Sequence, residues 1–271
     1  MRGESRSAVL GFPARAKPAV TARILPEPTR DARYDPACRR CPRLAAFLDE
    51  VRTAHPGYWC RPVPPFGDTR ARLLVVGLAP GMHGANASGR PFTGDHAGIL
   101  LYRTLHAYGF ASRPDGARAD DGLALTGCRV NNAVKCLPPA NKPSPAEIAG
   151  CNAFLAADLA TLPPRAAVLA LGRIAHEAVL RALGRRLAEH PFAHGATHRL
   201  SGVPDGAVLF DSYHCSRYNT NTRRLTPAMF AAVFDAIAAH LNPVRTTPTL
   251  ASLAAPIGGG SAPRGGPSEL T

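Results

Sequence analysis

Apolar residues are spaced along the chain in a way that predicts alternating strands and helices. Four short apolar runs bounded by glycine, proline or polar residues have the length of buried strands: residues 72–78, 128–134, 166–171 and 207–210. Apolar positions at helical spacing predict helices over residues 97–108, 144–161, 174–183 and 226–241. Ser144-Pro145-Ala146-Glu147 supports the second helix with a capping box and a proline at the first helical position. This alternation predicts an α/β fold, a three-layer α/β/α sandwich around a small, mostly parallel four-stranded sheet.

The two ends of the chain differ in composition from this body. Residues 1–33 are rich in Arg, Pro and Ala without periodicity, and residues 244–271 are rich in Pro and Gly. We therefore expect a flexible basic leader and a disordered tail around one domain at residues 34–243. The apolar run at residues 8–12 is too short for a secretory signal, and no stretch of about 18 apolar residues could span a bilayer.

The charge of the chain favours a polyanionic partner. The sequence has 32 Lys+Arg against 19 Asp+Glu, a formal net charge of +13, and its hydrophobic content of 45% excludes a wholly disordered protein. Nucleic acid is the first expected partner and an anionic membrane surface the second, although a generally Arg-rich proteome would produce the same surplus.

Polar or glycine-rich segments follow three of the four predicted strands. They are residues 77–81, 132–136 and 211–215, the last reading Asp211-Ser212-Tyr213-His214-Cys215. Ligands of parallel sheets bind beyond the carboxyl ends of the strands, where these segments meet. The sequence therefore places its candidate site at this edge.

Four of the seven cysteines have spacing suited to a metal. Cys38-x-x-Cys41 forms one pair, and Cys136 and Cys151 form a wider pair across a proline-rich turn. Four thiolates suit tetrahedral zinc or an iron–sulfur cluster. The wide second pair departs from a zinc ribbon and leans toward a cluster, while buried thiols without metal are the alternative.

The remaining cysteines indicate packing more than chemistry. Cys60 and Cys128 are expected in the core. Cys215 stands beside His214, but neighbouring side chains on a strand point to opposite faces, which disfavours a nucleophile–base pair. An odd number of cysteines without an export signal predicts a reduced, cytoplasmic protein.

Five motifs in order give the sequence a family resemblance that covers roughly residues 34–243. They are Cys38-x-x-Cys41-Pro42-x-Leu44, Gly77-Leu78-Ala79-Pro80-Gly81-x-His83-Gly84-Ala85-Asn86, Gly89-Arg90-Pro91-Phe92-Thr93-Gly94-Asp95, Lys135-Cys136-Leu137-Pro138-Pro139-x-Asn141-Lys142-Pro143, and Ser212-Tyr213-His214-x-Ser216-Arg217-x-Asn219-Thr220-x-Thr222-x-Arg224-Leu225-Thr226. With these motifs the sequence resembles the uracil-DNA glycosylase superfamily, most closely its iron–sulfur family 5 (type b).

The resemblance implies a four-iron four-sulfur (4Fe-4S) cluster on Cys38, Cys41, Cys136 and Cys151. It also implies a monofunctional DNA glycosylase of base excision repair that flips and excises uracil, with hypoxanthine, xanthine and other deaminated bases as further candidates. No lysine is placed to form a Schiff base, so we expect no lyase step. DNA is the expected partner of a monomeric enzyme on the nucleoid, without a membrane.

The resemblance also assigns roles at the site. Phe92 is expected to stack on the flipped base, and His214 to donate a hydrogen bond as negative charge builds on the base. Asp95 is the candidate to position water, because Leu78-Ala79 is apolar here, but Asp95 also suits a helix N-cap.

Reading the base edge requires an amide, and the sequence offers three. These are Asn131, Asn132 and Asn141. Asn141 matches the family 5 pattern and Asn132 matches the strand-end position of family 4, so these two are retained as alternatives.

Other motif residues are expected to contact DNA. Gly81, His83, Arg217 and Asn219 are assigned to substrate binding, and Gly81, Gly84 and Gly89 would let the backbone approach phosphate. Arg217, Arg223 and Arg224 suit phosphate contacts in a loop after His214, although a solvated basic loop is the alternative. Cys215 replaces the proline usual in the family, which leaves φ less restricted after His214.

Two other functions remain open from the sequence. One is a non-catalytic nucleic-acid-binding module with a structural metal. The other is a Cys–His hydrolase that uses Cys215.

Overall fold

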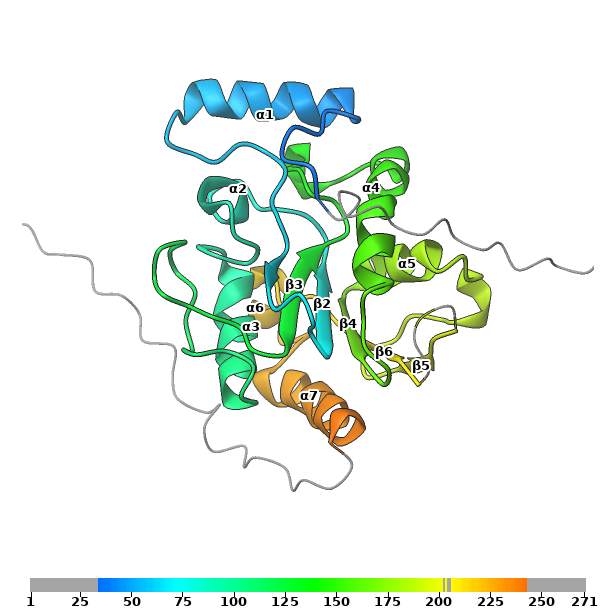
Figure 1. Ribbon diagram of the computed structural model, residues 1–271. Coiled ribbons are helices and arrows are strands. Elements are labelled where there is room, and N and C mark those ends of the chain that lie inside the picture. The colour runs from blue at the N-terminus through cyan, green and yellow to red at the C-terminus, as the bar shows by residue number, and fades with distance from the viewer. Residues whose placement is uncertain (1–33, 202, 204–205, 243–271) are drawn as a thin grey trace, which may run out of the picture.

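A computed structural model describes residues 34–201, 203 and 206–242 (Figure 1). The leader predicted at residues 1–33 and the tail predicted at 244–271 lie outside the described residues. No helix in the described part of the chain is long and apolar enough to cross a membrane.

The sheet has six strands in the order β1-β3-β2-β4-β6-β5. Their bounds are β1 Phe66–Gly67, β2 Leu73–Gly77, β3 Cys128–Asn132, β4 Ala167–Leu171, β5 Thr197–Arg199 and β6 Val208–Ser212. The four predicted strands are the parallel centre, and β1 and β5 add antiparallel edges. The prediction of four strands was therefore two short. β1 has only two residues and β5 is polar and largely exposed, so neither has the apolar pattern of a buried strand.

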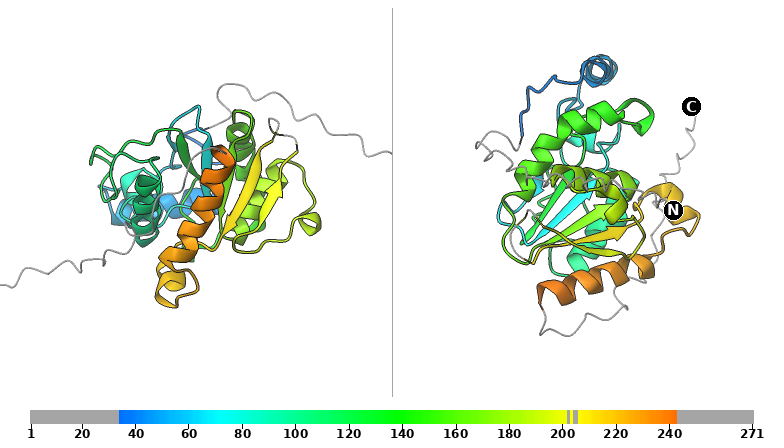
Figure 2. Two further views of the ribbon diagram at one scale, coloured as in Figure 1. Left: turned by 90° about the horizontal axis from the view of Figure 1, so that it is seen from below. Right: turned by 90° about the vertical axis from the view of Figure 1, so that its right-hand side faces the viewer.

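Helices cover both faces of the sheet, as Figure 2 shows. On one face, helices α3 (His96–Ala107) and α7 (Pro227–Leu241) pack against alternate residues of the strands. On the other face, helices α4 (Pro145–Leu159) and α5 (Arg173–Ala182) pack against the intervening residues. Parallel strands buried on both faces are continuously apolar, which explains the sequences of β2 and β4, while β3 and β6 also carry polar residues at their carboxyl ends. The α/β/α sandwich is confirmed.

The predicted helices begin and end within two residues of the observed ones. The capping box is present, since Ser144 and Glu147 each accept the other's backbone N–H. The short helices α2 (Ala85–Ser88) and α6 (Arg217–Asn221) lie in loops at the carboxyl ends of β2 and β6, and 3₁₀ turns occupy Pro139–Asn141 and Leu187–Glu189.

Helix α1 (Pro42–Ala54) lies outside the sandwich, above α2 and α4 in Figure 1. Its Leu44 packs against Val134 and Phe154, and its Arg43 forms a bidentate ion pair with Glu147 of α4 at 2.7 and 2.8 Å. The N-terminal part of the described chain is thereby fixed to the body.

Candidate active site and cysteine centre

Phe92 and His214 face each other beyond the carboxyl ends of the central strands. Their ring centroids are 6.0 Å apart and their planes are inclined by 26°. Phe92 comes from the loop after α2, and His214 from the segment that follows β6. Two loops far apart in sequence therefore place two flat rings at one edge of the sheet.

Phe92 is held rigidly in an unusual backbone conformation. Its φ of 56° lies in the left-handed region, which is strained for a residue other than glycine. Tyr102 donates its hydroxyl hydrogen bond to the carbonyl of Pro91 at 2.6 Å. Helix α3 approaches so closely at Gly98 that a Cβ there would overlap the Phe92 carbonyl oxygen. The surrounding structure thus fixes this ring.

The buried Arg90 anchors the same loop. Its guanidinium makes two hydrogen bonds to the carboxylate of Asp121, at 2.9 and 2.7 Å, and one to Thr93 Oγ1 at 2.6 Å. The same group lies over the ring of Phe66, 5.0 Å from its centroid. The ion pair holds the pKa of Asp121 well below its usual range.

Asn132 meets Phe92 above Gly77, at the paired ends of β3 and β2. A Cβ on Gly77 would overlap Asn132 Oδ1 and lie 2.6 Å from Phe92 Cζ, so only glycine leaves this space. Asn132 Oδ1 is buried and has no hydrogen-bond partner. A buried acceptor without a partner is unfavourable in the free protein and is available to a ligand.

The other two candidate amides are placed differently. Asn131 points to the opposite face of the sheet, where its amide donates to Asp158 and accepts from Lys135 Nζ and from the Asn132 N–H. Asn141 is exposed on the turn Pro139–Asn141, and none of its described hydrogen bonds involves Phe92, Asn132 or His214.

Lys135 connects the strand end to the cysteines. Its buried ammonium donates to Asn131 Oδ1 and, at 3.2 Å, to the carbonyl of Asn132, while its backbone N–H donates to Cys151 Sγ at 3.3 Å. Burial lowers the pKa of Lys135 to about 8.

His214 is neutral at physiological pH. Burial among protein atoms lowers its pKa to about 4, although the residue as a whole is partly exposed. Asn219 Nδ2 donates to the His214 carbonyl at 2.8 Å, so this residue positions the His214 backbone.

Cys215 packs in the core and does not resemble a nucleophile. Burial raises the pKa of its thiol to about 12, so it stays protonated at neutral pH. This argues against a Cys–His hydrolase.

Asp95 occupies the N-cap position of α3, but its side chain does not cap that helix. It accepts the backbone N–H of Ala85 at 3.1 Å, in the first turn of α2. The space that a Cβ would take at Gly81 and at Gly84 is filled by the Asp95 carboxylate. Burial raises the pKa of Asp95. Because Gly81 and Gly84 have no Cβ, they leave room for the Asp95 carboxylate.

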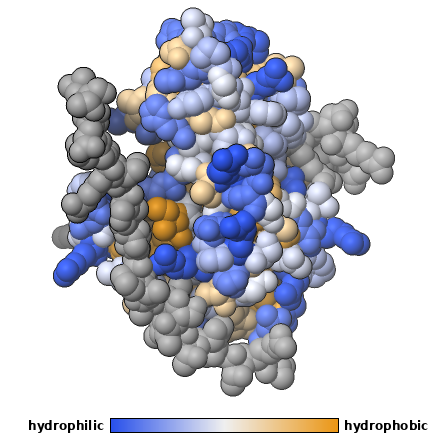
Figure 3. All heavy atoms as spheres, turned by 90° about the vertical axis from the view of Figure 1, so that its left-hand side faces the viewer, coloured by the Kyte–Doolittle hydropathy of each residue, from blue (hydrophilic) through white to orange (hydrophobic). Residues whose placement is uncertain are grey.

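The remaining predicted substrate contacts lie at the surface. His83 is exposed and its Nδ1 is hydrogen-bonded to the Tyr58 hydroxyl at 2.9 Å. Arg217 is exposed at the start of α6. Arg224 lies over the ring of Tyr213, 4.7 Å from its centroid. Figure 3 looks onto the side of the molecule that carries α3 and shows it as mostly hydrophilic, with a small apolar group near its centre.

Four cysteines line one small cavity under α1. Cys38, Cys41, Cys136 and Cys151 share it with apolar residues, among them Leu44, Val134 and Phe154. Burial, followed by the charges of the neighbouring cysteines, raises the pKa of Cys136 to about 12, and burial also raises that of Cys41 and Cys151. Thiols so placed repel one another as thiolates unless a metal neutralises them.

Sequence reasoning did not identify Arg90, Asp121, Gly77, Gly98 or Lys135 as important to the site. The motif letters contained three of them, Gly77, Arg90 and Lys135. The role of Arg90 depends on a partner 31 residues away and that of Gly77 on contacts across elements, while the role of Lys135 depends on its burial. An arginine between the glycine and proline of a loop motif was the signal available in the sequence for Arg90.

An aromatic ring, a neutral imidazole and an unpaired amide oxygen lie at the end of a parallel sheet, and groups of this kind are suited to a flat, uncharged heterocycle. Comparison with known proteins makes this specific. The profile of the uracil DNA glycosylase superfamily matches residues 64–238. The chain belongs to this superfamily, which confirms the expectation of a DNA glycosylase at the level of the family.

Individual relatives are similar over most of the chain. A type-5 uracil-DNA glycosylase of Thermus thermophilus is 50% identical over 73% of this chain and 90% of the relative. Type-5 enzymes of Pyrobaculum aerophilum and Mycobacterium tuberculosis are each 41% identical, over 74% and 73% of this chain and 88% and 75% of the relatives. The resemblance to family 5 inferred from the motifs is confirmed.

Proposed function

We propose that the protein excises uracil from DNA by hydrolysing the N-glycosidic bond without a lyase step, as the first reaction of base excision repair. The proposal rests on one observation: the unpaired Asn132 Oδ1 and the Phe92 ring both lie within 2.6 Å of the Cβ position of Gly77, and the same Phe92 ring faces the neutral His214. These are the groups that a flipped pyrimidine needs for edge reading and stacking.

The base edge identifies the ligand. Uracil presents an N–H between two carbonyl oxygens, so the N–H can donate to Asn132 Oδ1 while the amide Nδ2 donates to a carbonyl. Hypoxanthine and xanthine also present an N–H beside a carbonyl, and on this ground we include them as substrates. We assign this reading to Asn132 in preference to Asn131 and Asn141, because the amide of Asn131 is already bonded and Asn141 is exposed.

Stacking requires a movement. The His214 ring lies nearly parallel to Phe92 with 6.0 Å between the centroids, and so covers the face of Phe92 on which a base would stack. A base stacked on Phe92 needs about 3.5 Å above that ring, so it must displace the imidazole to the edge of the base, where a ring N–H can reach a carbonyl oxygen. Phe92 is fixed by its neighbours, and we therefore expect the segment of His214 to move. Cys215, in place of a proline, permits that change in φ.

His214 acts as a neutral hydrogen-bond donor. Negative charge builds on the base carbonyl oxygens as the glycosidic bond breaks, and a donor held at one of these oxygens after the movement stabilises the leaving group. Since the imidazole is neutral at pH 7, it needs no proton release before or after the step.

Asp95 is assigned to shaping the loop before Phe92. Its carboxylate is packed against Gly81 and Gly84 and accepts the Ala85 N–H, and these contacts support a positioning role over activation of water. Arg217, at the surface next to the His214 segment, is assigned to phosphate contact.

We also propose a 4Fe-4S cluster on Cys38, Cys41, Cys136 and Cys151. Tetrahedral zinc would need sulfur atoms about 3.8 Å apart, given a zinc–sulfur bond of about 2.3 Å. Among the described residues, the one group of three or more metal-ligating atoms within 4.8 Å of one another contains no cysteine. The four thiols therefore fit a larger centre than a single ion. When bound, the cluster would supply a cross-link between α1 and the body, and no step of the reaction is assigned to it.

A matched pair of variants tests the function. We expect the full-length protein to release uracil from a U·G duplex, and Asn132→Ala to lower kcat/KM about a hundredfold or more. Asn141→Ala should stay within a few-fold of wild type, because its side chain is exposed. Salt-dependent binding of the duplex without release of uracil, hypoxanthine or xanthine would instead support a non-catalytic binding module.

A further inference from the structure

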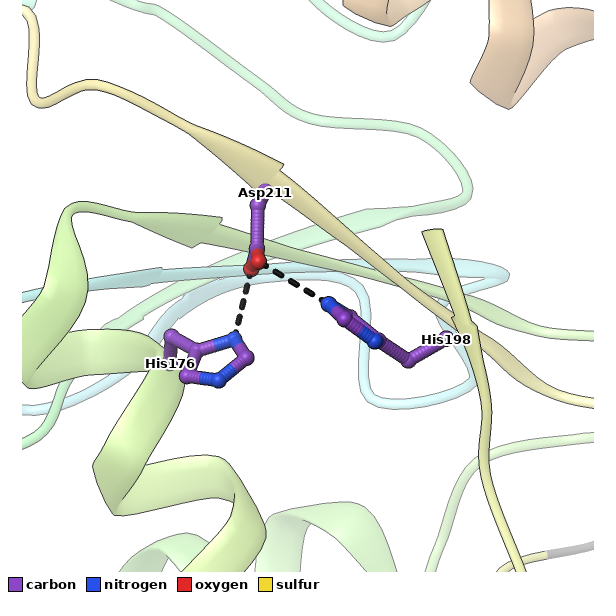
Figure 4. A group of neighbouring side chains, drawn as sticks. All are labelled: His176, His198 and Asp211. Carbon is purple, nitrogen blue, oxygen red and sulfur yellow. Dashed lines mark hydrogen bonds and ion pairs between the residues drawn. The ribbon is translucent and has the colours of Figure 1, made fainter. Parts of the chain in front are cut away.

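A second cluster of ionisable side chains lies on the α5 face of the sheet, apart from the site of Phe92. His176 comes from α5, His198 from the edge strand β5 and Asp211 from β6 (Figure 4). Their ligand atoms all lie within 4.8 Å of one another. His176 and Asp211 are buried, while His198 is partly exposed.

The hydrogen bonds of His176 fix its tautomer. Nε2 lies 2.9 Å from the carbonyl oxygen of His190, and a carbonyl can only accept, so Nε2 carries a hydrogen. Nδ1 lies 2.8 Å from Asp211 Oδ1. If the imidazole is neutral, the lone pair of Nδ1 faces a carboxylate oxygen. A positive species must therefore lie between them, either a second proton or a metal ion.

Three features of the cluster suit a metal ion. Two imidazoles and a carboxylate form a common donor set for zinc and similar ions. Both oxygens of Asp211 are used, because His198 Nε2 approaches Oδ2 at 3.1 Å from the other side. The His190 carbonyl supplies the outer-shell acceptor that metal-bound histidines usually have on their second nitrogen.

The cluster can adjust to the size of an ion. Bonds of about 2.0–2.2 Å in a tetrahedron separate donor atoms by about 3.4 Å. The two imidazoles must therefore move outward by a few tenths of an ångström. His198 permits this because it lies on a three-residue edge strand, which pairs with β6 alone in the described sheet.

We propose that His176 Nδ1, His198 Nε2 and Asp211 bind one divalent transition-metal ion of the zinc type, with a fourth position open to water. The ion would fasten α5 and the edge strand β5 to β6, the strand that leads directly to His214.

Zinc itself is the probe, added to the full-length protein with its cysteine centre loaded. After desalting, elemental analysis should find about one zinc per chain in wild type and about tenfold less or lower in His198→Gln. His106→Gln is the matched control, because His106 is exposed on α3 and should leave the zinc content unchanged. Zinc should raise the midpoint of thermal unfolding of wild type and His106→Gln, and not of His198→Gln.

X-ray absorption at the zinc edge of the wild-type protein provides a test without a variant. We expect nitrogen and oxygen neighbours at about 2.0–2.2 Å. A shell of sulfur at about 2.3 Å would place the zinc on cysteines and overturn the proposal. Equal zinc retention by wild type and His198→Gln, or none in wild type, would also overturn it and leave a proton between His176 and Asp211.

Discussion

At the scale of single residues, the groups around Phe92 are uncharged and incompletely bonded. His214 is neutral because its pKa is lowered to about 4, and Asn132 Oδ1 has no hydrogen-bond partner. Directed dipoles of this kind favour a neutral base over a phosphate. We propose that phosphate is instead bound by exposed residues such as Arg217.

The depressed pKa of His214 makes a testable contribution to acid sensitivity. Between pH 6.5 and about 4 the unfolded chain binds a proton on this side chain that the folded chain does not bind. Stability is therefore lost as pH falls through that window. We expect the loss of unfolding free energy between pH 7.5 and 4.5 to be about 1–2 kcal/mol smaller in His214→Gln than in wild type, after allowance for the exposed part of the residue.

Denaturant unfolding at the two pH values measures this difference. The carboxylates that titrate in the same range are common to both proteins and cancel in the comparison. An identical pH dependence in the two proteins would show that the folded state binds a proton on His214 as readily as the unfolded chain does.

The sequence identified the kinds of residue at the site, but it did not decide which of the candidate asparagines lies there. Phe92 and His214 were named from motifs, and the structure brings them together at the strand ends. Asn132 and Asn141 were not separated, because each matched a family pattern. What distinguishes Asn132 is its place beside Phe92 above Gly77, and no pattern within the strand or the turn contains that information.

At the scale of elements, the segment from Gly89 to Asp95 holds the Phe92 ring rigidly in place. A left-handed Phe92 costs about 1–3 kcal/mol and persists only where neighbours enforce it. The neighbours here are Arg90 with Asp121, and Tyr102 and Gly98 of α3.

Breaking the Arg90–Asp121 ion pair should make the Gly89–Asp95 segment less rigid. Both side chains are about nine-tenths buried, so Asp121→Asn leaves a buried cation without its counter-charge. We expect about 3 kcal/mol lower unfolding free energy and at least about a tenfold fall in kcat/KM for uracil release. Asp120→Asn is the control, because Asp120 pairs with Arg118 at the surface and should change stability by about 0.5 kcal/mol or less.

The two readouts separate two causes. If Asp121→Asn lost stability but kept full kcat/KM under folding conditions, the pair would serve only the fold, and the Phe92 loop would have other sufficient supports. If Asp120→Asn and Asp121→Asn had the same unfolding free energy and the same kcat/KM, the buried Arg90–Asp121 ion pair would not be needed to hold the Phe92 loop.

The elements that the sequence predicted are those with a strong apolar period. The four central strands and the four helices that cover them each bury one continuous surface, and the pattern follows from that burial. Helices α2 and α6 have four and five residues, too short for a period. Helix α1 was not predicted, although its buried Leu44, Leu48 and Val51 have helical spacing.

At the scale of the whole molecule, α1 is attached from outside the sandwich. It shares few apolar contacts with the body, and Arg43 of its Arg43–Glu147 ion pair is nearly half exposed. The proposed cluster would add bonds from Cys38 and Cys41 to Cys136 and Cys151, across a sequence separation that local structure does not bridge. Cys136 follows Lys135, whose ammonium contacts Asn132, so the same cross-link also supports the strand end of the active site.

The last prediction concerns this cross-link. In Cys41→Ser we expect loss of iron and of the visible absorbance of the cluster, and hydrogen exchange of the amides of α1 about tenfold faster or more. Amides of β2 and β4 should keep their protection, because their core does not include α1. Cys60→Ser is the matched control: Cys60 is buried beside Leu48 and Val51 but is outside the proposed ligand set, so iron content should be unchanged. Full iron content in Cys41→Ser would refute the ligand assignment. Loss of iron with unchanged exchange in α1 would instead show that apolar contacts and the Arg43–Glu147 pair are enough to hold this helix.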